Sequence, residues 1–143
     1  MAFRFQNILN HRKTLLDEKY LELSEARKKV ASLNLKIFDV QNSIDSYKNS
    51  YPADILNVSD VYGYNILDLK FNSLKYKLAE LLKMRESTEL ELEEKKAAVV
   101  RAKIEFEKID KLREKYLAVD KMNRLKRDEA VVSDFASNRF NRT

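Results

Sequence analysis

Apolar residues recur every seven positions along almost all of the 143-residue chain, and this repeat limits what the chain can fold into. In the first half one position of the repeat is held by Leu9, Leu16, Leu23, Val30, Ile37 and Ile44. The second position is held by Phe5, Ala26, Leu33, Val40 and Tyr47, with Arg12 and Lys19 as polar exceptions. A seven-residue repeat keeps one stripe facing a partner when helices supercoil. The pattern predicts a coiled-coil helix over about residues 4–50.

The second half carries the same repeat. One position is held by Phe71, Leu78, Leu92, Val99 and Phe106. The other is held by Leu67, Leu74, Leu81, Ala102, Ile109 and Tyr116, and is interrupted by Arg85, Thr88 and Lys95. This pattern predicts a longer helix over about residues 60–139. Two such arms in one short chain predict an all-α, antiparallel two-helix hairpin, a single elongated domain over residues 1–143.

A break between the arms is marked by Pro52, which lacks a backbone donor and disfavours helix in the residue before it. Ser59 and Asp60 can cap the second helix by accepting from its unpaired N–H groups, and Asn65 is an alternative cap. We therefore expect a connecting turn over about residues 51–59.

The two apolar positions of the repeat form the contact between the helices, which we call the seam. The register of the hairpin can be predicted from the residues of this seam. If the numbers of facing residues sum to 111, the layers near the turn are Ile44/Leu67, Val40/Phe71, Ile37/Leu74, Leu33/Leu78 and Val30/Leu81. A slip of one heptad in one direction sets Lys19 against Arg85, and a slip in the other leaves Pro52 inside a paired arm. With a sum of 111, roughly thirty residues of the second helix extend past residue 107 without a partner. This overhang carries a thinning apolar stripe of Leu112, Tyr116, Val119, Leu125, Val132 and Phe135.

Several kinds of chemistry are disfavoured by composition. The chain has one glycine, no cysteine and a single histidine, His11. Phosphate-cradling loops need several glycines, and thiolate sites need cysteine. We expect no catalytic, cofactor or metal site and therefore no enzyme. No apolar run approaches the roughly twenty residues of a membrane span, so we expect a cytoplasmic protein that can be peripheral at a membrane.

The carboxyl-terminal part is basic. From residue 111 onward it has nine cations and five anions, a net +4 of the chain's net +5. A basic arm is one feature of nucleic-acid binders, but acidic residues interrupt this one and no dense basic run precedes a zipper. We expect no nucleic-acid partner and no small-molecule substrate.

Large apolar residues also occupy outward positions near the turn, where polar residues are the rule. These residues are Leu35, Phe38, Tyr62, Ile66, Leu69 and Tyr76. Contiguous exposed apolar area typically marks a protein contact. The alternative is local packing of Ile55, Leu56 and Val58, which does not easily reach Leu35, Phe38 and Tyr76, some 20 Å from the turn on the helical rise.

Short motifs mark both ends of the chain. The opening motif is Phe3-Arg-Phe5-Gln-x-x-Leu9-x-x-Arg12. The closing motifs are Leu112-Arg-Glu-Lys-Tyr116 and Asp128-Glu129-x-x-x-x-Asp-Phe-x-x-x-Arg139-Phe140. These motifs resemble the FliJ family of flagellar type III export proteins. A departure lies at Arg124-Leu-Lys-Arg127, where the family often has a Glu-Gln or similar pair before the Asp-Glu.

The resemblance implies a stalk-like adaptor in a hexameric export ATPase. Its free helical ends would enter the ATPase ring, and Arg113, Tyr116, Arg124, Arg127 and Arg139 would line the pore. The turn end would meet the membrane export gate protein through Leu35, Phe38, Tyr62, Ile66, Leu69 and Tyr76. The family also escorts export chaperones. Two alternatives remain open: the equivalent stalk of a virulence-type secretion system, and a structural coiled-coil scaffold built by parallel self-association.

Overall fold

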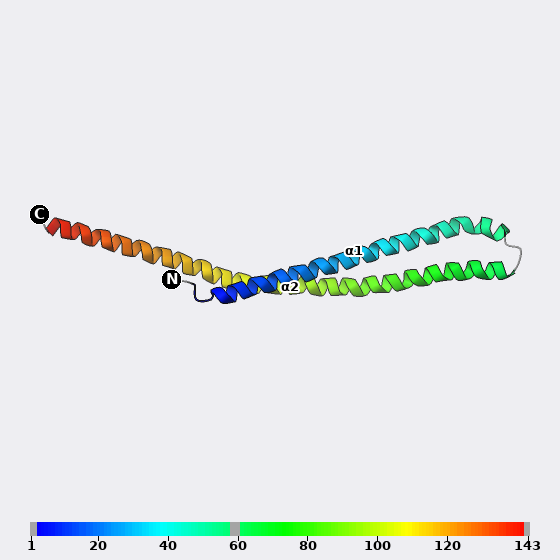
Figure 1. The fold of residues 1–143 in the computed structure, drawn as a ribbon, viewed down its shortest axis with the longest axis horizontal. Coiled ribbons are helices and arrows are strands. Elements are labelled where there is room, and N and C mark those ends of the chain that lie inside the picture. The colour runs from blue at the N-terminus through cyan, green and yellow to red at the C-terminus, as the bar shows by residue number, and fades with distance from the viewer. Residues whose placement is uncertain (1–2, 58–60, 142–143) are drawn as a thin grey trace. The chain divides into compact units, whose positions relative to one another are not determined.

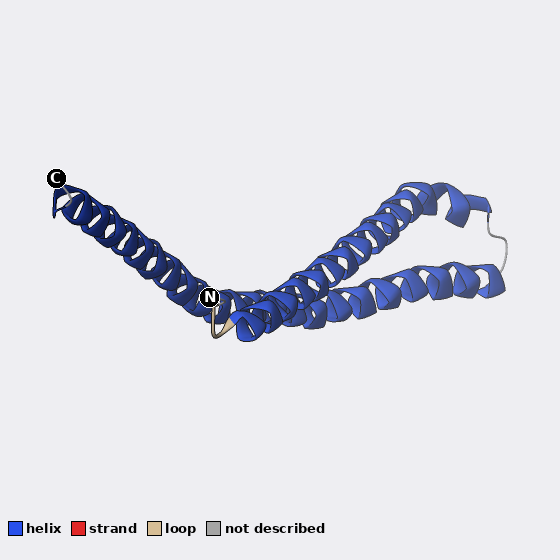
Figure 2. Ribbon diagram, turned by 60° about the vertical axis from the view of Figure 1, so that its left-hand side comes forward, coloured by secondary structure: helices blue, strands red, loops and turns tan. Residues whose placement is uncertain are grey.

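Two α-helices make up the chain in a computed structural model that describes residues 3–57 and 61–141, with side chains at 51, 52 and 54–57 outside the description. Helix α1 spans Gln6–Asn57 and helix α2 spans Val61–Asn141, which are 52 and 81 residues. The two helices pack antiparallel and α2 is the longer (Figures 1 and 2), which confirms the predicted fold class.

The end of α1 differs from the prediction, since the helix continues through Pro52 to Asn57. Proline removes one backbone hydrogen bond and favours a kink, but the costly step of helix formation is nucleation. By residue 52 a long helix already exists. The turn predicted over 51–59 therefore contains helix as far as Asn57, while Val58 and the predicted caps Ser59 and Asp60 lie outside the described residues.

Contacts divide the chain into two units, each built from a stretch of both helices. One unit comprises Lys19–Val99, and the other comprises Met1–Glu18 together with Val100–Thr143. The single-domain organisation expected from the sequence stays a prediction.

The predicted seam is the core of both units. Of its residues, Leu9, Leu16, Leu23, Ala26, Leu33, Ile37, Val40, Ile44, Leu81 and Val99 are buried. All other seam residues are half-buried except Phe5, which is 39% exposed. In the unit Lys19–Val99 a core cluster joins Leu33, Ile37, Val40, Ile44 and Leu81, with Phe71, Leu74 and Leu78 packed against it.

The register is one heptad away from the predicted one. The Tyr47 ring stacks on Phe71 with centroids 5.3 Å apart, and the numbers of that pair sum to 118. The Arg85 guanidinium lies 3.4 Å from the Asn34 amide oxygen, a sum of 119. Nearer the other end of this unit, the Lys95 ammonium donates to the Glu22 carboxylate at 3.2 Å, a sum of 117. The seam layers therefore pair residues near a sum of 118, and the predicted sum of 111 is wrong.

The polar seam residues are accommodated in this register as they would be in the predicted one. Lys95 is level with Leu23, and its ammonium extends out of the seam to Glu22, which Lys19 also contacts at 3.5 Å. The hydrogen bond from Lys95, assisted by Lys19, lowers the pKa of the Glu22 carboxyl. A long cationic side chain can bury its stem while keeping its charge in water. No layer of this register sets one cation against another.

The register can be tested by cross-linking because the chain contains no native cysteine. Under oxidising conditions Val40→Cys with Leu78→Cys is expected to form an intrachain disulfide, since the two side chains belong to one seam layer. Faster migration without reductant and a mass loss of two hydrogens would report the bond.

The matched control is Val40→Cys with Phe71→Cys, the layer that a sum of 111 predicts. In the observed register these residues are about 10 Å apart along the helix axis, too far for a disulfide without movement. Efficient cross-linking of the control in place of the first pair would contradict the register.

Candidate functional site

No metal-ligand cluster and no membrane span occur in the described part of the chain. Residues 3–57 and 61–141 contain no group of three or more His, Cys, Asp or Glu side chains that could hold a metal ion. None of their helices is long and apolar enough to cross a membrane. The candidate sites described below are exposed surfaces that could contact another macromolecule.

The six apolar residues predicted to contact a partner are all exposed, by 46–72%. They do not form one surface. Leu35 lies two residues before the seam residue Ile37, so its side chain points about 200° around α1 from the seam. Tyr76 lies two residues before the seam residue Leu78 and points away from α1 in the same manner. Since each points away from the other helix, Leu35 and Tyr76 are on opposite faces of the hairpin.

The observed register also changes which residues of α2 lie beside Leu35 and Phe38 along the hairpin. Leu35 is level with Lys83 and Phe38 with Glu80, whereas a sum of 111 would set Leu35 level with Tyr76. We call Leu35 and Phe38 the α1 pair. The remaining four residues follow one face of α2 within about 80° of arc, and we call this the α2 ridge: Tyr62, Ile66, Leu69 and Tyr76. A hydrogen bond with the Glu80 carboxylate raises the pKa of the Tyr76 phenol at the end of the ridge.

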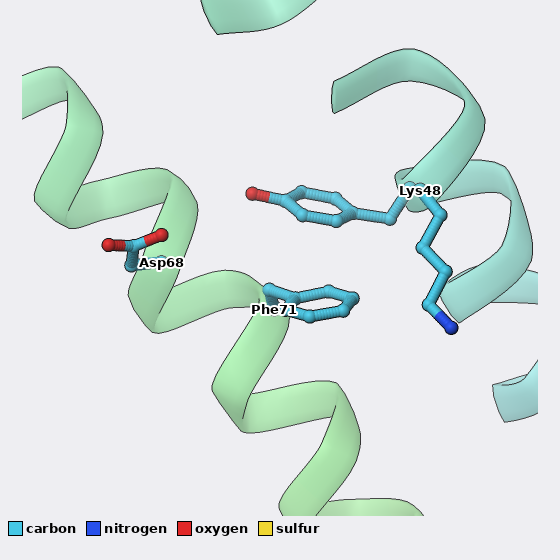
Figure 3. Close-up of a pocket in the computed structure, with 4 residues that line it drawn as sticks. Lys48, Asp68 and Phe71 are labelled. Carbon is cyan, nitrogen blue, oxygen red and sulfur yellow. The ribbon is translucent and has the colours of Figure 1, made fainter. Parts of the chain in front are cut away.

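A cavity of about 300 Å³ lies between the helices in the same part of the hairpin, lined by Tyr47, Lys48, Asp68 and Phe71. Figure 3 shows Lys48, Asp68 and Phe71 around this cavity, and the Phe71 ring is the one that stacks on Tyr47. The Tyr47 hydroxyl donates to the Leu67 carbonyl oxygen, and the Lys75 ammonium lies 4.2 Å from the Phe71 ring centroid. The Tyr47–Phe71 stack and the Tyr47–Leu67 hydrogen bond join the two helices across the seam, whereas the Lys75 contact lies within α2. The cavity walls therefore serve to hold the register.

Sequence reasoning missed this aromatic clamp. A sum of 111 pairs Phe71 with Val40, so Tyr47 and Phe71 were expected in different layers. Only their common placement in the seam could have suggested the pairing.

At the other end of the hairpin, the aromatic residues Phe3 and Tyr116 close the paired section. Their ring centroids lie 5.5 Å apart, and the Phe5 ring packs edge-on to Phe3 at 5.8 Å. The unpaired part of α2 therefore begins after Tyr116, not after residue 107 as predicted. The difference follows from the register, because a slip of one heptad covers seven more residues of α2.

We call residues 117–141 the overhang. From residue 121 to residue 141 every side chain is exposed, and no other helix accompanies this end of α2 in Figure 1. At 100° per residue six of its eight large apolar side chains gather within about 140° of arc, whereas Val119 and Val131 lie outside it. The stripe consists of Leu117, Met122, Leu125, Val132, Phe135 and Phe140. Leu112 and Val119, which the sequence analysis placed in the stripe, point elsewhere, and Tyr116 lies in the seam.

Four of the five residues predicted to line an ATPase pore are exposed: Arg113, Arg124, Arg127 and Arg139. The fifth, Tyr116, is half-buried against Phe3. The Arg124 guanidinium is paired with Asp120 at 3.1 Å. Within the described part of the chain, Arg113, Arg127 and Arg139 form no ion pair, so their charges are available to a partner.

A comparison with protein families matches residues 1–143 to the family described as "Flagellar FliJ protein". No curated protein and no solved structure matches the chain.

The overhang and the seam predict different rates of amide hydrogen exchange. A lone helix in water is marginally stable, whereas the seam opens only with loss of buried contacts. Amides of residues 121–141 are expected to exchange at least about a hundredfold faster than amides around Ile37, measured by mass spectrometry on the full chain. Equal protection of the two segments would contradict the assignment of the overhang as unaccompanied.

Proposed function

The chain belongs to the FliJ family and is thus a component of the flagellar export apparatus, and from this premise we propose that it is a non-enzymatic stalk. In this role it links a hexameric export ATPase to the membrane export gate protein and escorts export chaperones. The observation that carries the proposal is the overhang, in which residues 121–141 form continuous helix with every side chain exposed. Such a helix gains little from intrinsic propensity and is stabilised mainly by packing against something else.

The overhang is suited to a ring-shaped partner for a physical reason. Its apolar stripe supplies area for burial, while Arg127 and Arg139 supply charges that are not neutralised within the described chain. A pore lined by several subunits can contact a single helix from all sides. Arg113 and Tyr116, at the closed end of the paired section, would meet the rim of the ring.

For the gate we propose the α2 ridge as the contact. It places four large apolar residues along one helix face, including Leu69 and Tyr76 at 68% and 67% exposure. A groove on the gate could bury them together. The α1 pair faces the other way and cannot join the same flat contact. We assign no face of the hairpin to the chaperones.

A structural scaffold built from parallel coiled coils is disfavoured. The seam residues of α1 are already buried against α2 of the same chain. Parallel pairing between chains would require this core to be opened first.

Truncation tests the ATPase contact. A chain that ends at Tyr116 keeps the seam and the aromatic closure by Phe3, but it lacks the overhang. We expect it to retain the helicity of the paired section and to lose at least about tenfold of the stimulation of the hexameric ATPase, measured as phosphate release.

A substitution pair in the full chain separates the stripe from general charge effects. Leu125→Asp with Val132→Asp is expected to reduce stimulation. Asn123→Asp with Ser137→Asp adds the same charge on the side of α2 opposite the stripe and is expected to preserve stimulation. Full stimulation by the truncated chain would contradict the role of the overhang.

Charge substitution tests the gate contact. Leu69→Glu with Tyr76→Glu is expected to weaken binding to the gate protein at least about tenfold, since it sets two charges into an apolar contact. Helicity should be unchanged because both residues are exposed. Titration calorimetry with the purified gate domain would measure the affinity.

The matched comparison is Leu35→Glu with Phe38→Glu, which makes the same change on the opposite face and is expected to leave the affinity unaltered. Loss of affinity in that variant alone would move the contact to α1. Unchanged binding in both variants would remove both surfaces from the gate contact.

A further inference from the structure

Two cavities of similar size but opposite charge flank the seam in the middle of the unit Lys19–Val99. The first has a volume of about 390 Å³, and its lining includes Lys28, Lys29, Lys36, Leu33 and Met84. The second has a volume of about 430 Å³, and its lining includes Glu86, Glu89, Glu93, Val30 and Leu90. We call them the lysine cavity and the glutamate cavity. Each combines an apolar floor with three charges of one sign.

The cavities lie on opposite sides of the hairpin at the same level. On α2, Met84 is about 70° to one side of the seam direction, while Glu93 is about 110° to the other side. In the observed register residue 28 is level with residue 90 and residue 32 with residue 86. A single hairpin therefore presents a basic hollow on one side and an acidic hollow directly behind it.

Among the described residues, most charged side chains that line the two cavities form no ion pair. Within the described part of the chain Lys28, Lys29 and Lys36 take part in no ion pair. In the glutamate cavity Glu86 likewise has none. Glu89 and Glu93 have only weak partners from the adjacent turn, Arg85 at 4.0 Å and Lys96 at 3.2 Å. Exposed pairs of this kind contribute little, so most of the charge is available to a partner.

An exposed apolar side chain also stands beside the glutamates. Leu90 projects from the outer face of α2 beside the glutamates and is 64% exposed. The floor of the lysine cavity offers it Leu33, which is buried, and Met84, whose flexible side chain adapts to an inserted group. If Leu90 of one hairpin entered the lysine cavity of another, Glu86 and Glu93 would approach Lys28 and Lys36.

We propose that the hairpin associates laterally with a second copy of this chain, with the glutamate cavity of one copy against the lysine cavity of the next. The contact is heterologous because the two hollows lie on opposite sides, so it can continue from copy to copy. It uses neither the overhang nor the α2 ridge and does not depend on the proposed stalk function. The small cavities and the exposed charges make the contact weak and sensitive to salt.

Sedimentation velocity of the full chain tests the proposal. At low ionic strength the weight-average sedimentation coefficient is expected to rise as the concentration increases from about 10 to 300 µM, and the rise is expected to disappear in about 0.5 M salt. Wild-type protein that remains monomeric over this range at low salt would overturn the proposal.

Charge reversal gives a sharper test. Lys28→Glu with Lys36→Glu, and separately Glu86→Lys with Glu93→Lys, are each expected to weaken association at least about tenfold, because each sets like charges against one another. An equimolar mixture of the two variants is expected to associate again. The acidic lysine cavity of the first variant then faces the basic glutamate cavity of the second, and the two unchanged cavities also complement each other.

The control for the lysine variant is Lys77→Glu with Lys103→Glu, which lowers the net charge by the same amount away from both cavities and is expected to associate like wild type. Circular dichroism would verify equal helicity throughout. Failure of the mixture to associate, or equal weakening by the control, would assign any association to net charge and overturn the proposal.

Discussion

Burial of one apolar stripe of α1 against one apolar stripe of α2 is the interaction on which the rest of this molecule depends. The two helices have no other partner within the described chain, and the buried residues all lie along their common seam. Each fully buried aliphatic side chain contributes about 1.5–3 kcal/mol, whereas a long helix without packing is marginal in water. The helices of the hairpin are therefore stable where their seam residues are buried. Where the seam ends after Tyr116, helix stability must come from the sequence itself or from a partner.

The composition of the seam could be predicted from the sequence, but its register could not. A heptad repeat determines which side of each helix is apolar, and the predicted seam residues are buried or half-buried almost without exception. The same repeat is unchanged by a slip of seven residues. The charges did not distinguish the two registers, because Arg85 lies level with Leu33 in one and with Ala26 in the other. Only Pro52 distinguished them, and α1 continues through that residue. The Tyr47–Phe71 stack and the Glu22–Lys95 ion pair are specific to the observed register.

For the candidate surfaces, the sequence predicted which residues are exposed but not how they are arranged. Leu35 and Tyr76 are exposed because both occupy the outermost position of the repeat, and that position can be read from the sequence. The outermost positions of two paired helices point in opposite directions, so equal exposure does not make one surface. The overhang was predicted to exist because α2 is longer than α1, but its starting point moved from residue 107 to beyond Tyr116 with the register. An error of seven residues in the predicted register thus explains two differences. The Tyr47–Phe71 stack was not predicted, and the predicted overhang was too long.

The aromatic closure at the end of the paired section separates the stability of the hairpin from that of the overhang. Phe3 covers Tyr116, so fraying of the overhang need not extend into the seam. Local opening is governed by local buried contacts, and residues 121–141 have almost none to lose. A partner that binds the overhang must therefore provide the contacts that order it, which lowers affinity relative to a preformed surface. The lysine and glutamate cavities are already held in place by the seam, and a contact there has no such ordering cost. The two kinds of surface consequently differ in what limits their binding: ordering of the helix for the overhang, and screening of exposed charge for the cavities.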